Sequence, residues 1–283
     1  MDRIITGDTI TEFTGFLKDS EKSPATVEKY THDINRLMDW LNGETVTSER
    51  MRQWKESLMA EGLSPKTVNT KICAFNKFAA YMGWDDLKLK SLRVQRAMFR
   101  SKEKELSRRE YERLIKGAAN SLGKQPAIII ETIGATGMRV SEVKYLTLES
   151  VKRGRVEISL KGKVRTIILP AKLQRKLTKF ADERGIKEGV IFRTRTGNPV
   201  GRKQIWAQMK EAAAKAGIEP GKAFPHNMRH LFARVYYKAT RNLAELASLL
   251  GHSSMETTRI YLLTTEESHQ KMLFLIMQTR PLP

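Results

Sequence analysis

The chain has 283 residues, of which 40% are hydrophobic, and its formal net charge is +20. A chain of this length can bury one large core or two ordinary ones, so we expect a globular protein. Its single cysteine, Cys73, excludes a disulfide within the chain. No uncharged apolar run approaches the roughly 18 residues of a membrane span, and the first residues lack a signal-peptide pattern, so we expect a cytoplasmic protein.

The positive charge is unevenly distributed along the chain. Residues 1–90 carry a net charge of −1, which leaves +21 on residues 91–283. Clustered lysine and arginine side chains attract polyanions, because binding releases the counterions condensed around phosphates. DNA, RNA and an anionic membrane surface would all satisfy this charge, so the motifs must decide among them.

Residues 1–90 are predicted to form a four-helix domain. The pairs Ser23-Pro24 and Ser64-Pro65 each predict a helix start. Serine accepts a hydrogen bond from a free backbone N–H of the first turn, and proline, which has no N–H, loses no hydrogen bond at the first helical position. Apolar residues follow both pairs at helical spacing, and helices near residues 8–19 and 47–61 complete the bundle.

Within these helices, the apolar residues are expected to form the core. The tryptophans are interpreted as packing residues: Trp40, Trp54 and Trp84. Cys73 stands beside Ile72 and near Phe75 in the helical pattern, so we expect a buried structural thiol.

Residues 91–105 are predicted to be a basic linker. The segment has no sustained apolar face and carries five basic side chains: Arg93, Arg96, Arg100, Lys102 and Lys104. A solvated connector would explain this composition, and so would a linker that follows a DNA backbone. Ser107 and Glu110 then have the spacing of a capping box, which opens a second domain over residues 106–283.

The second domain is predicted to be mostly helical with one β-hairpin. Residues 155–160 and 164–169 alternate between apolar and polar, with a Lys161-Gly162-Lys163 turn between them. Helices are expected near residues 171–184, 201–216, 226–239, 242–250 and 255–261, and a last amphipathic helix at 266–278. The predicted fold class is therefore mainly α with a small sheet.

Five fragments of this domain carry residues suited to attack on a phosphodiester without a metal: 135–142, 161–163, 226–230, 250–252 and 258–261. Such a reaction needs a nucleophile, a proton donor and positive charge around the phosphate.

Arg139 and Arg229 are suited to clamp a phosphate, because a guanidinium bonds two oxygens and stays charged. Arg139 follows a break at Gly137, so its side chain and nearby N–H groups could face a concave site. Glu142 could hold its guanidinium or form only a solvated pair.

His226 and His230 lie on one helix face with Arg229. Their spacing matches a zinc-binding pair, but Asn227 replaces the catalytic glutamate and no third ligand follows, so we predict no metal and no cofactor. An imidazole beside an arginine suits proton transfer or hydrogen bonding to phosphate. Tyr261 follows nine residues after the histidine of fragment 250–252. It is either a half-buried core residue or a nucleophile activated by these cations.

In this order and spacing, the five fragments resemble the motifs of the tyrosine recombinases, the phage integrase family. The resemblance covers residues 106–283, and residues 8–85 are similar to the family's SAM-like core-binding domain. It implies a site-specific recombinase that cleaves and rejoins double-stranded DNA through a 3′-phosphotyrosyl intermediate. A homotetramer on two DNA sites would exchange strands through a Holliday junction.

The resemblance also implies a role for each site residue. Tyr261 would attack the scissile phosphate, and Lys161 would protonate the leaving 5′ oxygen. Lys163 could replace Lys161, because the turn is one residue shorter than in many relatives. Arg139 and Arg229 would bind the phosphate.

The other polar residues of the motifs would assist. His226 would help proton transfer at the tyrosine, and His252 would hydrogen-bond a phosphate oxygen. Glu142 and His230 would support the site. The tail, 266–278, packs on its own domain or, as in the family, docks into a neighbouring protomer.

The biological role is less constrained by the motifs. The chain begins at the core-binding domain, so we expect the simple two-domain type rather than the larger, lambda-like integrases with an arm-binding module. Leu262-Leu263 follow the tyrosine where Xer proteins commonly have Thr-His, which favours integration or excision of a mobile element, with accessory directionality factors as further partners. Xer-type resolution of chromosome or plasmid dimers is the alternative. A type IB topoisomerase and a DNA-binding regulator with a decayed site are rivals, disfavoured by the small first domain and by the full set of catalytic residue types.

Residues that contact DNA are predicted from charge and position. They lie on the 64–82 helix, in the linker, at the hairpin tip and on the 201–216 helix: Lys66, Lys71, Arg96, Arg100, Lys163 and Lys203.

Overall fold

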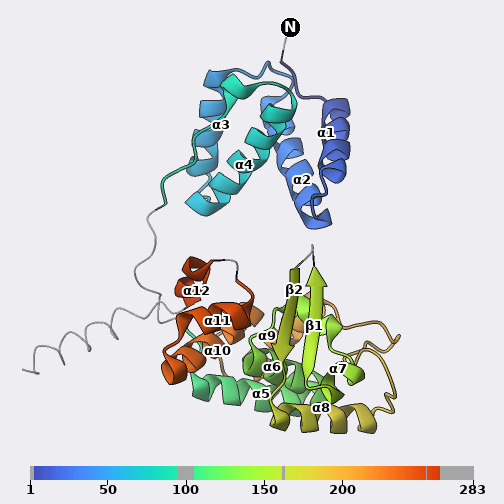
Figure 1. The fold of residues 1–283 in the computed structure, drawn as a ribbon. Coiled ribbons are helices and arrows are strands. Elements are labelled where there is room, and N and C mark those ends of the chain that lie inside the picture. The colour runs from blue at the N-terminus through green and yellow to red at the C-terminus, as the bar shows by residue number, and fades with distance from the viewer. Residues whose placement is uncertain (1–2, 95–104, 161–162, 253, 262–283) are drawn as a thin grey trace, which may run out of the picture. The chain divides into compact units, whose positions relative to one another are not determined.

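The computed structural model describes residues 3–94, 105–160, 163–252 and 254–261, and it divides the chain into two compact units, 1–96 and 97–283 (Figure 1). The boundary falls within the segment predicted as a linker. Over the described ranges, no helix is both long and apolar enough to cross a membrane. The predicted linker residues Arg96 and Arg100, Lys161 of the turn and the 266–278 tail lie outside the described residues.

The first unit contains four helices and a short 3-10 turn: α1 (Gly7–Asp19), α2 (Pro24–Leu41), α3 (Ser48–Ala60), α4 (Pro65–Tyr81) and η1 (Asp85–Leu87). Both predicted Ser-Pro starts are confirmed. Ser23 accepts the backbone N–H of Thr26 at 3.2 Å, and Ser64 accepts that of Thr67 at the same distance. Each serine therefore satisfies one of the free donors of its helix.

Aromatic side chains fill the core of this unit. Trp54 and Trp84 are buried there, and Trp40 packs against the core with the Arg50 guanidinium 4.7 Å from its ring. The prediction of a buried Cys73 is wrong, because its side chain is exposed. Successive helical residues are rotated by about 100°, so Cys73 points away from the buried face that includes Ile72.

Two asparagines of α4 hold the segment that leads toward the predicted linker. Asn69 accepts the backbone N–H of Leu92 at 2.7 Å and donates to its carbonyl at 2.9 Å. Asn76 makes the same pair of bonds with Leu89, both at 2.9 Å. The two amides replace the backbone partners that an adjacent strand would supply, and they hold residues 89–92 against α4.

The second unit contains helices on both sides of a short hairpin in sequence: α5 (Arg108–Leu122), α6 (Lys124–Thr136), η3 (Val140–Tyr145), α7 (Leu148–Lys152), β1 (Arg155–Leu160), β2 (Lys163–Ile168), α8 (Ala171–Glu183), α9 (Arg202–Lys215), α10 (Pro225–Thr240), α11 (Leu243–Leu250) and α12 (Met255–Tyr261). The capping box that opens α5 is confirmed, since Ser107 and Glu110 bond each other's backbone N–H. The later helices lie within two residues of their predicted bounds.

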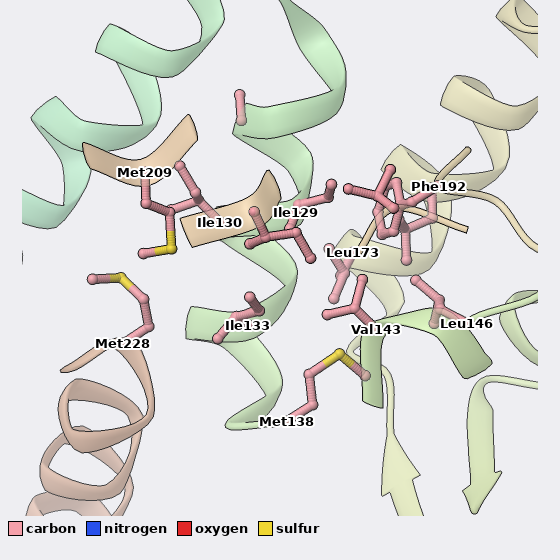
Figure 2. Close-up of a cluster of buried hydrophobic side chains, with 14 of the residues drawn as sticks. Ile129, Ile130, Ile133, Met138, Val143, Leu146, Leu173, Phe192, Met209 and Met228 are labelled. Carbon is pink, nitrogen blue, oxygen red and sulfur yellow. The ribbon is translucent and has the colours of Figure 1, made fainter. Parts of the chain in front are cut away.

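Helix α6 is the central helix of this unit. Figure 2 shows Ile129, Ile130 and Ile133 of α6 among side chains from other elements, including Met209 of α9 and Met228 of α10. Because α6 is apolar on several sides, α5, α8, α9 and α10 can all pack against it. This packing holds the C-terminal end of α6, where the fragment 135–142 begins.

The hairpin is antiparallel, with Arg155 opposite Ile168 and Leu160 opposite Lys163. Val156, Ile158 and Ile167 face the core, while the outward-facing Ile168 is 64% exposed. The observed architecture confirms the predicted fold class, a mainly helical chain with a small sheet.

Candidate active site

A glycine places the first arginine of the site. Helix α6 ends at Thr136, and Gly137 takes a φ of +63°, where a Cβ would lie 2.5 Å from the ring of Phe232. Arg139 then caps η3, and Glu142 accepts both its backbone N–H, at 2.6 Å, and its Nη1, at 2.9 Å. The predicted Arg139–Glu142 pair is confirmed. The Arg139 side chain lines a concave site, as expected, whereas the backbone N–H of Arg139 is bonded to Glu142.

Three arginines converge on the C-terminal end of α11. The successive carbonyls of residues 249–251 accept one bond each from Arg165, Arg229 and Arg139, at 2.9, 2.5 and 3.1 Å. Carbonyls at a helix C-terminus lack partners in the helix and carry partial negative charge. They therefore hold three cations side by side where like charges would otherwise repel.

Arg229 is the most buried of the three. Its side chain has no exposed surface, and it also donates to the carbonyl of Gly137 at 2.5 Å and to Nε2 of His252 at 2.9 Å. Burial, with the charges of Arg139 and Arg165, lowers the pKa of Arg229 to about 10. The guanidinium consequently remains charged at neutral pH.

Glu142 is the buried anion of this cluster. Burial would raise its pKa, but the backbone N–H of Arg139 and the guanidinium groups of Arg165 and Arg139 outweigh burial and lower it. Nη1 of Arg165 lies 2.5 Å from both carboxylate oxygens. Arg139, Arg165 and Arg229 together with one carboxylate leave a net charge of +2, which suits an anionic ligand.

Arg165 is a site residue that the motifs did not identify. It lies on β2, and its side chain is only 11% exposed. The sequence signal is the position of Arg165 in the strand, where side chains alternate between two faces. Ile167 and Leu169, two and four residues later, are both buried, so Arg165 points to the same inward face. An inward arginine on a half-buried strand needs a buried partner, and Glu142 is that partner.

Tyr261, the last residue of α12, lies in the same cluster. The centroid of the Tyr261 ring is 4.2 Å from that of His230 and 5.0 Å from that of His252. The guanidinium carbon of Arg229 lies 5.8 Å from the centroid of the Tyr261 ring. The structure thus brings the predicted nucleophile together with two of the three histidines and one arginine.

A cavity of about 460 Å³ opens beside the arginines. It is lined by Met138, Arg139, Val140, Ser141, Arg202, Lys203, Trp206, Phe224, Pro225, His226 and Arg229. His226 is exposed at this cavity, and partial burial of its ring with the charges of Arg229 and Arg139 lowers its pKa. Predicted Lys203 lies here, and Trp206, 50% exposed, was not predicted.

The other predicted DNA contacts occupy different environments. Lys66 is exposed near the start of α4, whereas Lys71 is 17% exposed and lies 3.2 Å from the buried carboxylate of Asp33. This ion pair directs the Lys71 ammonium group toward the buried carboxylate of Asp33. The side chains of Lys161 and Lys163 lie outside the described part of the chain.

Comparison of the chain with known protein families identifies the family to which it belongs. Residues 104–268 match the profile of the Phage integrase family, and residues 10–85 match that of the phage integrase N-terminal SAM-like domain. The chain belongs to the phage integrase family. The prediction of a tyrosine recombinase, an enzyme that cleaves and rejoins DNA strands, is confirmed at the level of this family.

Similarity within the family extends over both domains. The chain is 28% identical over 271 residues to the tyrosine recombinase XerA of Thermococcus kodakarensis, covering 93% of each chain. It is 25% identical over 255 residues to the tyrosine recombinase XerD of Vibrio cholerae, covering 83% of this chain and 84% of that one.

Two solved structures share the fold. One is the XerH recombinase bound to its difH substrate, with a TM-score of 0.69 and 19% identity over 94% of this chain and 89% of that chain. The other is a lambda integrase dimer bound to a COC′ core site, with a TM-score of 0.73 and 18% identity over 92% of this chain and 78% of that chain.

Proposed function

We propose that this chain is a site-specific DNA recombinase whose nucleophile is Tyr261. The observation that carries the proposal is the position of the Tyr261 ring, which lies against two imidazoles and the buried Arg229 in a cluster of net charge +2. A phenol with a pKa near 10 needs such cations, because they stabilise its oxyanion as it attacks.

The reaction exchanges one phosphoester for another. The Tyr261 oxygen bonds to phosphorus while the bond from phosphorus to the 5′ oxygen breaks, which leaves a 3′-phosphotyrosyl enzyme and a 5′-hydroxyl. Lys161 supplies the proton to the 5′ oxygen, with Lys163 as the alternative donor. The energy of the broken ester is kept in the new one, so no external energy source is needed.

The remaining residues bind the phosphate and move protons. Arg139 and Arg229 hold the non-bridging oxygens, His252 donates to one of them, and His226 accepts the tyrosine proton. His230 and Glu142 support the site: the imidazole of His230 contacts the nucleophile, and Glu142 holds Arg139.

Access to Arg229 requires a local rearrangement. The guanidinium is fully buried and already bonded to two carbonyls and to His252. Nε of Arg229 is buried without a hydrogen-bond partner among the described residues, so a phosphate can bond Arg229 there or in place of one of these three partners, of which His252 is itself proposed to bind phosphate. We infer that the Arg229–His252 bond is the one exchanged when His252 turns its ring N–H to the phosphate.

The partner of the enzyme is double-stranded DNA, held by the basic second unit and by the first unit with the linker. Two bound sites and four protomers form the recombining complex, which proceeds through a Holliday junction and acts at the nucleoid. The 266–278 tail links neighbouring protomers. Lys66, Arg96, Arg100, Lys163 and Lys203 contact the DNA, and Lys71 contacts it by exchanging Asp33 for a phosphate.

The biological role proposed is integration or excision of a mobile element, with accessory directionality factors. Xer-type resolution of dimers is the second candidate, and the similarity to XerA over 93% of both chains favours it. Recombination between two directly repeated sites on one plasmid, with and without host factors, distinguishes these roles.

The first experiment uses nicked duplexes that carry candidate sites from beside the gene. Wild type is compared with Tyr261→Phe for a protein–DNA adduct that resists SDS. An adduct with wild type alone, and equal DNA binding by both proteins, is the expected result. Adducts with both proteins would identify a different nucleophile, and specific binding without any adduct would favour a regulator.

A further inference from the structure

His252 lies between an arginine and a hydroxyl. Its Nε2 is 2.9 Å from Nη2 of Arg229, and its Nδ1 is 2.8 Å from Oγ1 of Thr258. Thr258 is fully buried and belongs to α12, three residues before Tyr261. Each ring nitrogen thus has one partner, and the protein holds both partners in place.

The chemistry of the two partners decides which nitrogen carries the proton. A guanidinium has donors only, so Nε2 must accept from Arg229. In a neutral ring the other nitrogen then carries the hydrogen, and Nδ1–H donates to Thr258. Partial burial and the charges of Arg229, Arg139 and Arg165 lower the pKa of His252 to about 4, so the ring is neutral at neutral pH.

This tautomer is unsuited to a bound phosphate. A phosphate oxygen that bonds Arg229 would face the lone pair of Nε2, and two acceptors repel. A neutral His252 can donate to that oxygen only as the Nε2–H tautomer, in which Nδ1 becomes an acceptor. A hydroxyl both donates and accepts, so Thr258 can satisfy Nδ1 in either state, whereas a carboxylate or a carbonyl could not.

We propose that Thr258 is a positioning residue that holds the His252 ring in one orientation while its tautomer changes on phosphate binding. In this change Nδ1 gives its proton to water, Nε2 takes a proton from water, and the Thr258 hydroxyl turns from acceptor to donor. The ring stays neutral, and water is the only co-reactant. The catalytic consequence, an N–H aimed at the phosphate beside Tyr261, rests on the proposed strand cleavage.

Two substitutions separate the hydroxyl from the packing of the side chain. Thr258→Val keeps the branched shape and removes the hydroxyl, and it should slow adduct formation about 10- to 100-fold, by analogy with the loss seen when the partner that orients a metal-bound histidine is removed. DNA affinity should be unchanged. Thr258→Ser keeps the hydroxyl and should restore most of the rate. Thr257→Val is the matched control, because Thr257 is the exposed neighbour in the same helix.

The tautomer can be measured without DNA by nitrogen-15 NMR of the histidine-labelled full chain. The chain has five histidines, and the spectrum of His252→Gln identifies the signals of His252. We expect Nδ1–H in the free protein and Nε2–H in the complex of Tyr261→Phe with the nicked duplex. We also expect Thr258→Val to lose the single ordered tautomer.

Three results would overturn the proposal: Nε2–H in the free wild type, an unchanged His252 spectrum in Thr258→Val, or a wild-type rate of adduct formation in Thr258→Val. Absence of an adduct with wild type would instead refute the proposed cleavage. The spectra of the free proteins would still decide whether Thr258 orients the ring, so the two failures are distinguishable.

Discussion

Replacing Glu142 by glutamine tests whether this single carboxylate holds the arginine cluster together. The substitution keeps the size of the side chain and removes the anion that Arg139 and Arg165 share. At an effective dielectric constant near 20, one charge pair about 4 Å apart contributes roughly 4 kcal/mol before desolvation. Breaking a buried pair by removing one partner typically costs about 3–5 kcal/mol, and we expect a loss of that size in the free energy of unfolding.

The assay must report on the second unit alone. Hydrogen exchange of peptides from α6 and η3, measured by mass spectrometry, gives the local free energy of opening, and peptides from α4 serve as an internal control in the other unit. The double variant Glu142→Gln/Arg165→Met should cost less than the sum of the two single variants, because it also removes one unpaired cation. A loss below about 1 kcal/mol for Glu142→Gln would refute this account of the cluster.

The pH dependence has a definite sign. Because the pKa of Glu142 is lowered in the folded state, its stabilisation is fully present above the unfolded value near 4.3 and is lost as the pH falls through the lower folded value. Glu142→Gln should lack this loss below pH about 4.3. An identical acid dependence in both proteins would mean that the carboxylate is not ionised in the fold.

Three further predictions address other parts of the structure. Gly251→Ala introduces a Cβ 2.5 Å from Cδ of Arg165 at a φ of +60°, so unfolding in urea should show a loss of at least about 1 kcal/mol, and a neutral effect would contradict this geometry. The double variant Asn69→Ala/Asn76→Ala frees residues 89–92, so limited proteolysis between residues 88 and 104 should be faster than in wild type; equal rates would show that the amides do not hold this segment. His252 has a pKa of about 4 in the fold and near 6.5 when unfolded, so the unfolded chain binds more protons between these values and wild-type stability rises with pH across that window. His252→Gln should flatten this rise, and an unchanged slope would show that the ring is not held neutral.

The burial of Arg229 changes how the proposed mechanism starts. The Arg229 guanidinium is bonded to the C-terminal carbonyls of two helices and to His252. The two carbonyls stabilise the buried charge, because helix C-termini attract cations. In the proposed mechanism, the more exposed Arg139, with 37% of its side chain accessible, is therefore the arginine that an incoming phosphate would meet first.

Local sequence signals determined most of the secondary structure and the family. The Ser-Pro pairs, the Ser107–Glu110 capping box and the alternation of residues 155–160 and 164–169 depend on neighbours within four residues, so they can be recognised without a fold. The pairing of Arg139 with Glu142 was predictable for the same reason, since the two residues are one helical turn apart. The spaced motifs then identified the catalytic chemistry.

Only the tertiary structure decided which groups face one another inside the site. Arg165 reaches Glu142 across 23 residues and Leu249 across 84, and Arg139 reaches Gly251 across 112. Periodicity gives the face on which a residue lies, but it does not give the distance between two faces. The burial of Arg229 by its carbonyl partners and the contact of His230 with Tyr261 arise when α6, α10, α11 and α12 pack together, so they are properties of the assembled unit.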